Sequence, residues 1–274
     1  MEMYSASIVL FKNDYNEVRD LIKDLLSFQK DKLRIFLIDN SPTDQLKILV
    51  NNAEENIEYI HNPLNPGFGA AHNVALKKAL DYNSPYHFVV NPDVSFGGDV
   101  IGPMISHMNE DQDIGMMMPQ ILNTDGTVQN LPKLLPSPFS VLMRKLKWPD
   151  FIYSKFINNY ELRFVPRDLI YSAPILSGCF TLLRMSAVKE IGTYDDKFFM
   201  YFEDWDLSRR MHQKYKTLYF PAVSVTHGYE SGANKSKKLF KIFINSAITY
   251  FNKWGWFYDK ERWAVNREAL KQFK

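Results

Sequence analysis

At the centre of the chain lies Tyr86-His87-Phe88-Val89-Val90-Asn91-Pro92-Asp93-Val94. Its β-branched and aromatic residues end abruptly at Asn-Pro-Asp, which predicts a buried strand that runs out into a polar tip. Pro92 ends the strand because it has no N–H to give a neighbouring strand. Open α/β sheets bind ligands at the carboxyl ends of their strands, so Asp93 is a candidate divalent-metal ligand and Asn91 a neutral polar contact. A plain turn is the alternative, since all three residues are common in turns.

The residues before this stretch alternate between strand and helix patterns. Residues 5–11, 33–38 and 57–61 are apolar and predict strands, whereas 15–28 has the apolar spacing of an amphipathic helix and 43–52 predicts a second helix. Strands that alternate with helices are typical of a parallel sheet with right-handed crossovers. The sequence therefore predicts an α/β fold.

Two further candidates for donor binding come from this half. Asp39 ends a predicted strand and could accept hydrogen bonds from a nucleobase or ribose, although a helix-capping or turn role is the alternative. Gly67 and Gly69 allow the backbone to approach a ligand, and a helix that begins there points its amides at negative charge. His72 stands where a dinucleotide fingerprint needs a third glycine, so we interpret the loop as facing a phosphate or a sugar.

The second half contains an acidic cluster. An aromatic run over residues 198–202 ends at Glu203, Asp204 and Asp206, where a helix begins. Acids in a first helical turn are favoured by the helix dipole, but capping needs only one of them. A carboxylate at this position could take a proton from an incoming hydroxyl. Cys179 lies in an apolar strand, and a buried structural thiol is favoured over a nucleophile.

Further along, a predicted strand over 219–227 ends at His227. This histidine is a candidate metal ligand or hydrogen-bond donor to a phosphate, or else an ordinary surface histidine.

The segment at residues 131–168 contains five prolines and has no clean periodicity, which predicts an excursion from the fold or a lid. Residues from 235 onward are mostly helical, with a break at 254–256.

Charge is distributed unevenly along the chain. The net charge is +2, but residues 133–167 carry +5, residues 235–274 carry +7, and the remainder carries −10. Both basic segments are rich in aromatic residues, which is the composition of interfacial membrane contact. The alternative is a pair of amphipathic helices that pack on the core or at a dimer interface with a solvated basic face. An oligomer is compatible with either interpretation, and we expect no nucleic-acid partner.

The composition also limits the class of protein. With 274 residues, the chain is long enough for a substantial core, and its single cysteine excludes an intramolecular disulfide framework. We expect no signal peptide, because the first fifteen residues are interrupted by charges. No window reaches the ~18 uninterrupted apolar residues that a spanning helix needs. These features predict a cytoplasmic protein, with peripheral contact at the inner face of the cell membrane as an extension of that expectation.

Several motifs follow one another in a familiar order. They are Asp39-Asn40-Ser-x-x-Asp44, Asn65-x-Gly67-Phe68-Gly69-x-x-x-Asn73, Asn91-Pro92-Asp93, Ser177-Gly178, Phe198-Phe-Met-Tyr-x-Glu203-Asp204-x-Asp206-Leu207-x-x-Arg210 and a late His227. The ordered set resembles inverting family 2 glycosyltransferases of GT-A fold, most of all the bacterial rhamnosyltransferase-like branch. The resemblance implies a Rossmann-like, mainly parallel central sheet flanked by helices. We expect the glycosyltransferase domain at residues 1–232 and a basic, aromatic helical extension at 233–274.

The resemblance also implies roles for individual residues. Asp39 would hold the nucleobase, and Asp93 and His227 would bind Mg²⁺ or Mn²⁺ on the donor diphosphate. Asp204 would be the catalytic base, with Glu203 beside it. The remaining implied positions are donor-binding Asn40, Asn65, Gly67, Asn73 and Asn91, and acceptor-binding Asp206 and Gly178. Many relatives have an acid where this chain has Asn91, which lowers the expected metal affinity.

The implied reaction is transfer of a sugar from a nucleotide-sugar donor, specifically rhamnose from dTDP-rhamnose, to a glycan or lipid-linked glycan acceptor in bacterial surface polysaccharide synthesis. Two other classes compete with it. A nucleotidyltransferase should carry a glycine- and arginine-rich loop after the first strand, where this chain has residues 11–14, Phe-Lys-Asn-Asp. A non-catalytic sugar-binding scaffold has no need of Asp93, Asp204 and His227 together.

Overall fold

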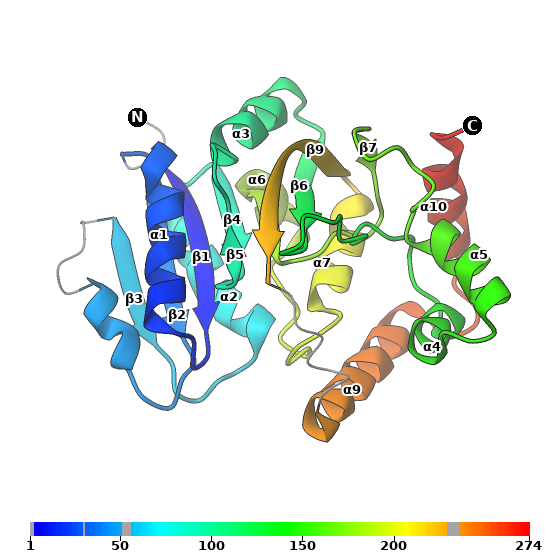
Figure 1. The fold of residues 1–274 in the computed structure, drawn as a ribbon, viewed down its shortest axis with the longest axis horizontal. Coiled ribbons are helices and arrows are strands. Elements are labelled where there is room, and N and C mark those ends of the chain that lie inside the picture. Colours follow the sequence, from blue (N-terminus) through cyan, green and yellow to red (C-terminus); the bar gives the residue numbers. More distant parts are fainter. Residues whose placement is uncertain (1–2, 30, 51–55, 229–235) are drawn as a thin grey trace.

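The computed structural model describes residues 3–29, 31–50, 56–228 and 236–274, which form one central sheet with helices on both faces (Figure 1). The strands are β1 (Tyr4–Leu10), β2 (Leu33–Asp39), β3 (Ile57–His61), β4 (Tyr86–Val90), β5 (Val94–Ser95), β6 (Ile114–Leu122), β7 (Tyr171–Ser172), β8 (Phe180–Arg184) and β9 (Lys216–His227). The helices are α1 (Tyr15–Gln29), the 3₁₀ helix η1 (Gln45–Val50), α2 (Phe68–Asp81), α3 (Ile101–Glu110), α4 (Pro138–Leu146), α5 (Asp150–Tyr160), α6 (Met185–Ile191), α7 (Glu203–His212), α9 (Lys237–Trp254) and α10 (Lys260–Lys271).

The strand order in the sheet is β3-β2-β1-β4-β8-β6-β9-β5, and β7 also pairs with β9. The strands β3, β2, β1 and β4 are parallel, whereas β8 is antiparallel to both of its neighbours, β4 and β6. Since β9 is parallel to β6, it runs in the same direction as β4. The expected α/β architecture with a mainly parallel sheet is therefore confirmed, and the carboxyl ends of β1, β2, β4 and β9 meet at one edge.

Alternation along the strands explains the two helical layers. In β1, Ile8 and Leu10 pack in the main core with α1, whereas Val9 points to the other face and packs with α2. The helices α1 and α3 contact each other on the first face, and α6 contacts both α2 and α7 on the second. Because both faces are covered, β4 is buried along its whole length.

A second core cluster joins α7 to α9. Phe198, Phe202 and Trp205 pack against Phe243 and Tyr250 of α9. Gly255, at φ 100°, follows the last residue of α9, which confirms the break expected at residues 254–256. Among the described residues, no helix is both long enough and apolar enough to cross a bilayer.

Two sequence expectations differ from the structure. The helix expected at 43–52 is the short 3₁₀ helix η1, and positions 51–52 lie outside the described residues. The stretch at 131–168, which lacked a clean periodicity, contains two regular helices, α4 and α5, where the sequence analysis gave helical structure only as an alternative. Its prolines begin these helices: Pro138 is the first residue of α4, after a capping box at Ser137, and Pro149 is the N-cap of α5.

Candidate active site

The carboxyl ends of β4 and β9 bring the first group of candidate residues together. Asn91 and Asp93 follow β4, and His227 is the last residue of β9. The Nε2 atom of His227 lies 3.2 Å from Asn91 Nδ2 and 3.3 Å from Asp93 Oδ1. The strand β5, which follows Asp93, pairs with the end of β9 and fixes this contact. Residues 136 positions apart in the sequence thus share one corner of the sheet edge.

Gln129 holds the ring of His227 from its other side. The Nε2 of Gln129 donates to the carbonyl oxygen of His227 at 2.9 Å, and its Oε1 lies 3.3 Å from His227 Nδ1. Because the amide NH₂ is committed to the carbonyl, the oxygen faces the ring, and we assign the imidazole proton to Nδ1. Nε2 then presents its lone pair toward Asn91 and Asp93, which is the orientation a metal ligand needs.

This corner has a donor set that fits a divalent cation. Asp93 and His227 offer a carboxylate and an imidazole, and the buried Oδ1 of Asn91 has no hydrogen-bond partner among the described residues. Buried acceptors normally have a partner, so an orphaned oxygen here marks a place for one. Within the described ranges, no three His, Cys, Asp or Glu side chains converge on one point. A cation here would therefore take its further oxygen ligands from substrate phosphates, as Mg²⁺ commonly does.

Asp39 lies at a separate cavity of about 780 Å³, which is lined by residues between 12 and 15 and between 39 and 48. Its Oδ1 accepts from the backbone N–H of Ser41 at 2.8 Å, and its Oδ2 accepts from the Tyr59 hydroxyl at 2.6 Å. Burial and the neighbouring Asp39 carboxylate raise the pKa of Tyr59, so its hydroxyl remains a donor. Asn40 is buried beside Asp39 but does not line the cavity.

The segment from Asn65 to Asn73, which leads into the first turns of α2, contacts the chain segment that precedes α7. Gly67 has φ 107°, and a Cβ there would lie 2.2 Å from the carbonyl oxygen of Phe199. The Asn73 Nδ2 donates to Tyr194 O at 2.9 Å, and its Oδ1 accepts from Tyr194 N at 2.9 Å. None of the three residues Asn65, Gly67 and Asn73 lines the cavity beside Asp39. They also do not line a second cavity, of about 430 Å³, that is described below. In the structure, these residues position the aromatic segment that leads to the acidic cluster.

Glu203 and Asp204 occupy the first turn of α7. The two residues before it, Tyr201 and Phe202, have φ values of 70° and 68°, an unusual conformation for bulky side chains. Asp204 Oδ1 accepts from the N–H of Trp205 at 2.9 Å, and its Oδ2 accepts from the N–H of Gly178 at 3.3 Å. The position where Gly178 would carry a Cβ is 3.4 Å from Asp204 Cβ, so the two residues are in van der Waals contact range.

The two acids differ in their surroundings. Burial, and then the charge of Asp204, raise the pKa of Glu203 well above its ordinary value. Burial also raises the pKa of Asp204, but the Gly178 N–H and the positive charge of Lys133 act in the opposite direction. We therefore place a proton on Glu203 and the negative charge on Asp204. A carboxylate with a raised pKa is a stronger base than an exposed aspartate.

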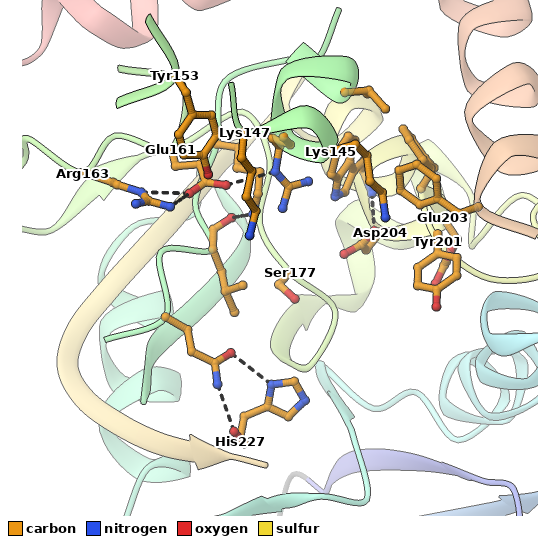
Figure 2. A pocket seen from close by; sticks show the side chains of 18 residues that line it. Lys145, Lys147, Tyr153, Glu161, Arg163, Ser177, Tyr201, Glu203, Asp204 and His227 are labelled. Atoms are coloured by element: carbon orange, nitrogen blue, oxygen red, sulfur yellow. Dashed lines mark hydrogen bonds and ion pairs between the residues drawn. The ribbon is translucent and has the colours of Figure 1, made fainter. Parts of the chain in front are cut away.

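One cavity of about 430 Å³ reaches from this acid pair to His227. Figure 2 shows His227 and Asp204 on different sides of it, with Ser177 between them. Basic side chains form much of the remaining wall; they are Lys133, Arg144, Lys145, Lys147 and Arg163. The cavity therefore combines His227 of the candidate metal corner, a buried pair of carboxyl groups and positive charge.

The basic wall was not foreseen residue by residue. Lys133 is buried, its Nζ donates to Leu131 O at 2.6 Å, and burial lowers its pKa to about 8. The Nε atoms of Arg144 and Arg163 lie 3.1 and 2.9 Å from the two carboxylate oxygens of Glu161. The only signal in the sequence was the excess of basic residues over 133–167.

Two residues considered for chemistry lie away from this cavity. Asp206 is fully buried, and its carboxylate is held by Arg210, Lys253 and Trp254 at 2.7–2.8 Å, so that it ties α7 to α9. It lines neither cavity. Cys179 is buried, and burial raises the pKa of its thiol to about 12, which leaves it unreactive at neutral pH.

Residues 7–192 match the sequence profile of "Glycosyl transferase family 2". The chain belongs to this family. It is 26% identical over 246 residues to the N-acetylglucosaminyl-diphospho-decaprenol L-rhamnosyltransferase of Mycobacterium tuberculosis, covering 84% of this chain and 79% of that protein. It is also 24% identical over 253 residues to the rhamnosyltransferase WbbL of Escherichia coli, covering 89% and 91%.

Solved structures of glycosyltransferases share the fold. GalNAc-T7, crystallised with UDP, GalNAc and Mn²⁺, superposes with a TM-score of 0.59 at 14% identity, and the match covers 90% of this chain and 48% of that one. TarS of S. aureus also gives a TM-score of 0.59 at 14% identity, covering 99% of this chain and 42% of that one. The chain thus spans less than half the length of these two proteins. At this identity the likeness establishes the GT-A fold alone.

Proposed function

We propose that this glycosyltransferase moves rhamnose, with inversion, from dTDP-rhamnose to a lipid-linked glycan in bacterial surface polysaccharide synthesis. The observation that carries the proposal is the single cavity that has His227 on one side and Asp204 on the other. The names of the relatives from M. tuberculosis and E. coli both describe rhamnosyl transfer. The name of the first also describes an acceptor in which a diphosphate links the sugar to decaprenol.

The donor is divided between two places at the sheet edge. The nucleobase occupies the cavity beside Asp39, where one carboxylate oxygen is anchored by Tyr59 and the other by a backbone amide. The diphosphate lies at the corner of Asn91, Asp93 and His227, and the sugar extends into the cavity with Asp204. Mg²⁺ or Mn²⁺ held by Asp93 and His227, with Asn91 Oδ1 beside them, would stabilise negative charge on the leaving diphosphate.

The acceptor hydroxyl enters on the side of Asp204. The carboxylate of Asp204 takes the hydroxyl proton while the oxygen forms a bond to the anomeric carbon and the bond from that carbon to the diphosphate breaks. One base opposite one leaving group gives a single displacement and therefore inversion. A positioned general base contributes about 10²- to 10⁴-fold to such a step. Glu203, which we consider protonated, stays beside Asp204 as a neutral neighbour.

The positive wall favours an anionic acceptor. Lys145, Lys147 and Arg163 line the same cavity as Asp204, with Arg163 on the far side beside Glu161 (Figure 2), and the diphosphate of a lipid-linked glycan can pair with the two lysines. This arrangement supports a location in the cytoplasm, where the enzyme meets lipid-linked acceptors at the inner face of the membrane.

The test measures release of nucleoside diphosphate from a panel of nucleotide sugars with Mg²⁺ or Mn²⁺ and lipid-linked acceptors. We expect release from dTDP-rhamnose and a loss of about 10²- to 10⁴-fold in Asp204→Asn, with donor binding retained. Asp113→Asn, the same change at an exposed carboxylate with 79% of its side-chain surface accessible, should match the unaltered protein. Glu203→Gln keeps a neutral side chain and should lose far less than Asp204→Asn. No release from any donor, or lost donor binding in Asp204→Asn, would overturn the assignment.

A further inference from the structure

Two helices that wall the acceptor side of the cavity also have apolar side chains on their outer faces. In α4, Phe139, Leu142 and Leu146 are 54%, 52% and 60% exposed. In α9, a second stripe recurs at spacings of four residues, and its members Phe240, Ile244 and Ile248 are 47%, 38% and 41% exposed. Apolar stripes of this kind normally face a core, and an exposed contiguous patch marks an interaction surface.

The two helices are neighbours, so the stripes belong to one region of the surface. Lys145 Nζ of α4 lies 4.5 Å from the ring centroid of Phe243 and 5.8 Å from that of Phe240, both in α9. Figure 1 shows α4, α5 and α9 at the same end of the molecule. The connection from α4 to α5 adds Trp148, and the first turn of α5 adds Phe151; they are 72% and 77% exposed. Lys145 also lines the cavity, so the patch and the cavity share a wall.

Charge decides which partner fits this patch. Neither α4 nor α9 contains an Asp or Glu residue, and the surface includes one exposed acid, Asp150, between Trp148 and Phe151. Four lysines, Lys147, Lys237, Lys238 and Lys241, are exposed beside the apolar side chains and outnumber it. A second copy of the chain would bring the same cations against one another in a two-fold interface. Apolar stripes flanked by lysines instead match a bilayer surface with anionic headgroups.

We propose that α4, the Trp148–Phe151 connection and α9 form a docking surface for an anionic lipid bilayer. The proposal deepens, and rests on, the proposed function with a lipid-linked acceptor. Phe139, Leu142, Leu146, Ile244 and Ile248 enter the boundary between headgroups and acyl chains, and the lysines pair with lipid phosphates. Because α4 and α9 separate this surface from the cavity, docking places the cavity mouth beside the membrane that holds the acceptor.

The test is co-sedimentation of the full chain with vesicles of phosphatidylcholine alone or of phosphatidylcholine and phosphatidylglycerol in equal parts. We expect binding to the anionic vesicles that weakens as salt is added, and little binding to the neutral ones. The variant Leu142→Ser/Leu146→Ser/Ile244→Ser and the variant Lys237→Gln/Lys238→Gln/Lys241→Gln should each bind at least about tenfold more weakly. These positions are exposed, and circular dichroism with thermal unfolding confirms that each variant folds.

The matched control is Phe28→Ser/Leu64→Ser, which removes two apolar side chains that are 46% and 90% exposed in the other half of the molecule. It should bind vesicles like the unaltered chain. Equal binding by all variants, equal loss in the control, binding to neither vesicle, or a dimer in light scattering that the apolar variant abolishes would each overturn the proposal. Vesicle binding needs neither donor nor metal. If the chain binds vesicles but fails to transfer a sugar even to a water-soluble, short-chain acceptor, the proposed function fails while the docking surface stands.

Discussion

At the scale of single residues, the orientation of the His227 ring depends on Gln129, a residue that is not itself a candidate metal ligand. Gln129 fixes the ring by two contacts, one to Nδ1 and one to the backbone carbonyl. Asp93, Asp204 and His227 could be singled out as candidates from the sequence because each lies at or near the end of an apolar run. Gln129 and Lys133 offered no such signal, because they lie where the chain has no periodicity and gain their roles only through the tertiary fold.

Gln129→Leu tests the role assigned to this residue. Leucine removes both contacts, so the metal-free protein should lose its preference for the Nδ1–H tautomer of His227. Nitrogen-15 NMR of the histidine rings reports that preference directly. Affinity for Mn²⁺ should fall by about 10- to 100-fold, as for other partners that orient a metal ligand. Gln129→Glu keeps an acceptor for Nδ1–H and should keep the tautomer. Unchanged ring signals in Gln129→Leu would contradict the assignment.

At the scale of elements, the sequence predicted those helices and strands in which a single spacing of apolar residues dominates. The helix expected at 15–28 is α1, and the strands expected at 33–38 and 57–61 are β2 and β3. The helices α4 and α5 were given only as an alternative because five prolines suggested an irregular segment, although a proline is well tolerated at the start of a helix. Which helices pack together could not be predicted, because the ion pairs between them join residues about 50 positions apart.

Arg209 is the main polar link between α7 and the start of α10. Only 2% exposed, it makes a bidentate pair with Asp259 at 2.8 and 2.9 Å and contacts Glu261 at 2.7 Å. Arg209→Met removes the bidentate partner of the buried Asp259 carboxylate and leaves it only Arg262, whose Nη1 lies 3.6 Å away and whose N–H donates at 2.9 Å, so it should lower the free energy of unfolding by up to about 3–5 kcal/mol. Urea titration measures the change.

The double variant Arg209→Met/Asp259→Asn separates the effect of the lost ion pair from the effect of the lost packing of the Arg209 side chain. Adding Asp259→Asn removes the buried charge that has lost its bidentate partner and keeps an N-cap for α10, so the double variant should be more stable than Arg209→Met alone. Lys214→Gln breaks an exposed pair with Glu190 and should change stability by less than about 1 kcal/mol. If the effects at 209 and 259 simply add, the two side chains are not coupled.

At the scale of the whole molecule, the direction of each strand decides where the chemistry lies. The antiparallel β8 lies between β4 and β6, and because two reversals restore direction, β9 ends at the same edge as β4. The parallel half of the sheet was predictable from the alternation of strands and helices. The insertion of β8 was not, since a short apolar strand has the same sequence pattern in either direction. That insertion brings His227 to Asp93.

The same parallel half contains a feature that makes the stability of the whole fold depend on pH. His87 is fully buried in β4, between the hydroxyls of Ser5 and Ser7 at 2.7 and 2.8 Å, and burial lowers its pKa to about 3. An unfolded histidine has a pKa of about 6.5, so between these values the unfolded chain binds a proton that the folded chain excludes. Acidification through this window therefore favours unfolding, by about 1.4 kcal/mol per pH unit where the unfolded chain binds one proton more than the folded chain.

Urea unfolding measured from pH 6.5 to pH 4 should show a shallower loss of stability in His87→Gln than in the unaltered chain. The comparison rests on the slope, because the substitution also changes packing at every pH, and equal slopes would mean that His87 does not contribute to acid sensitivity.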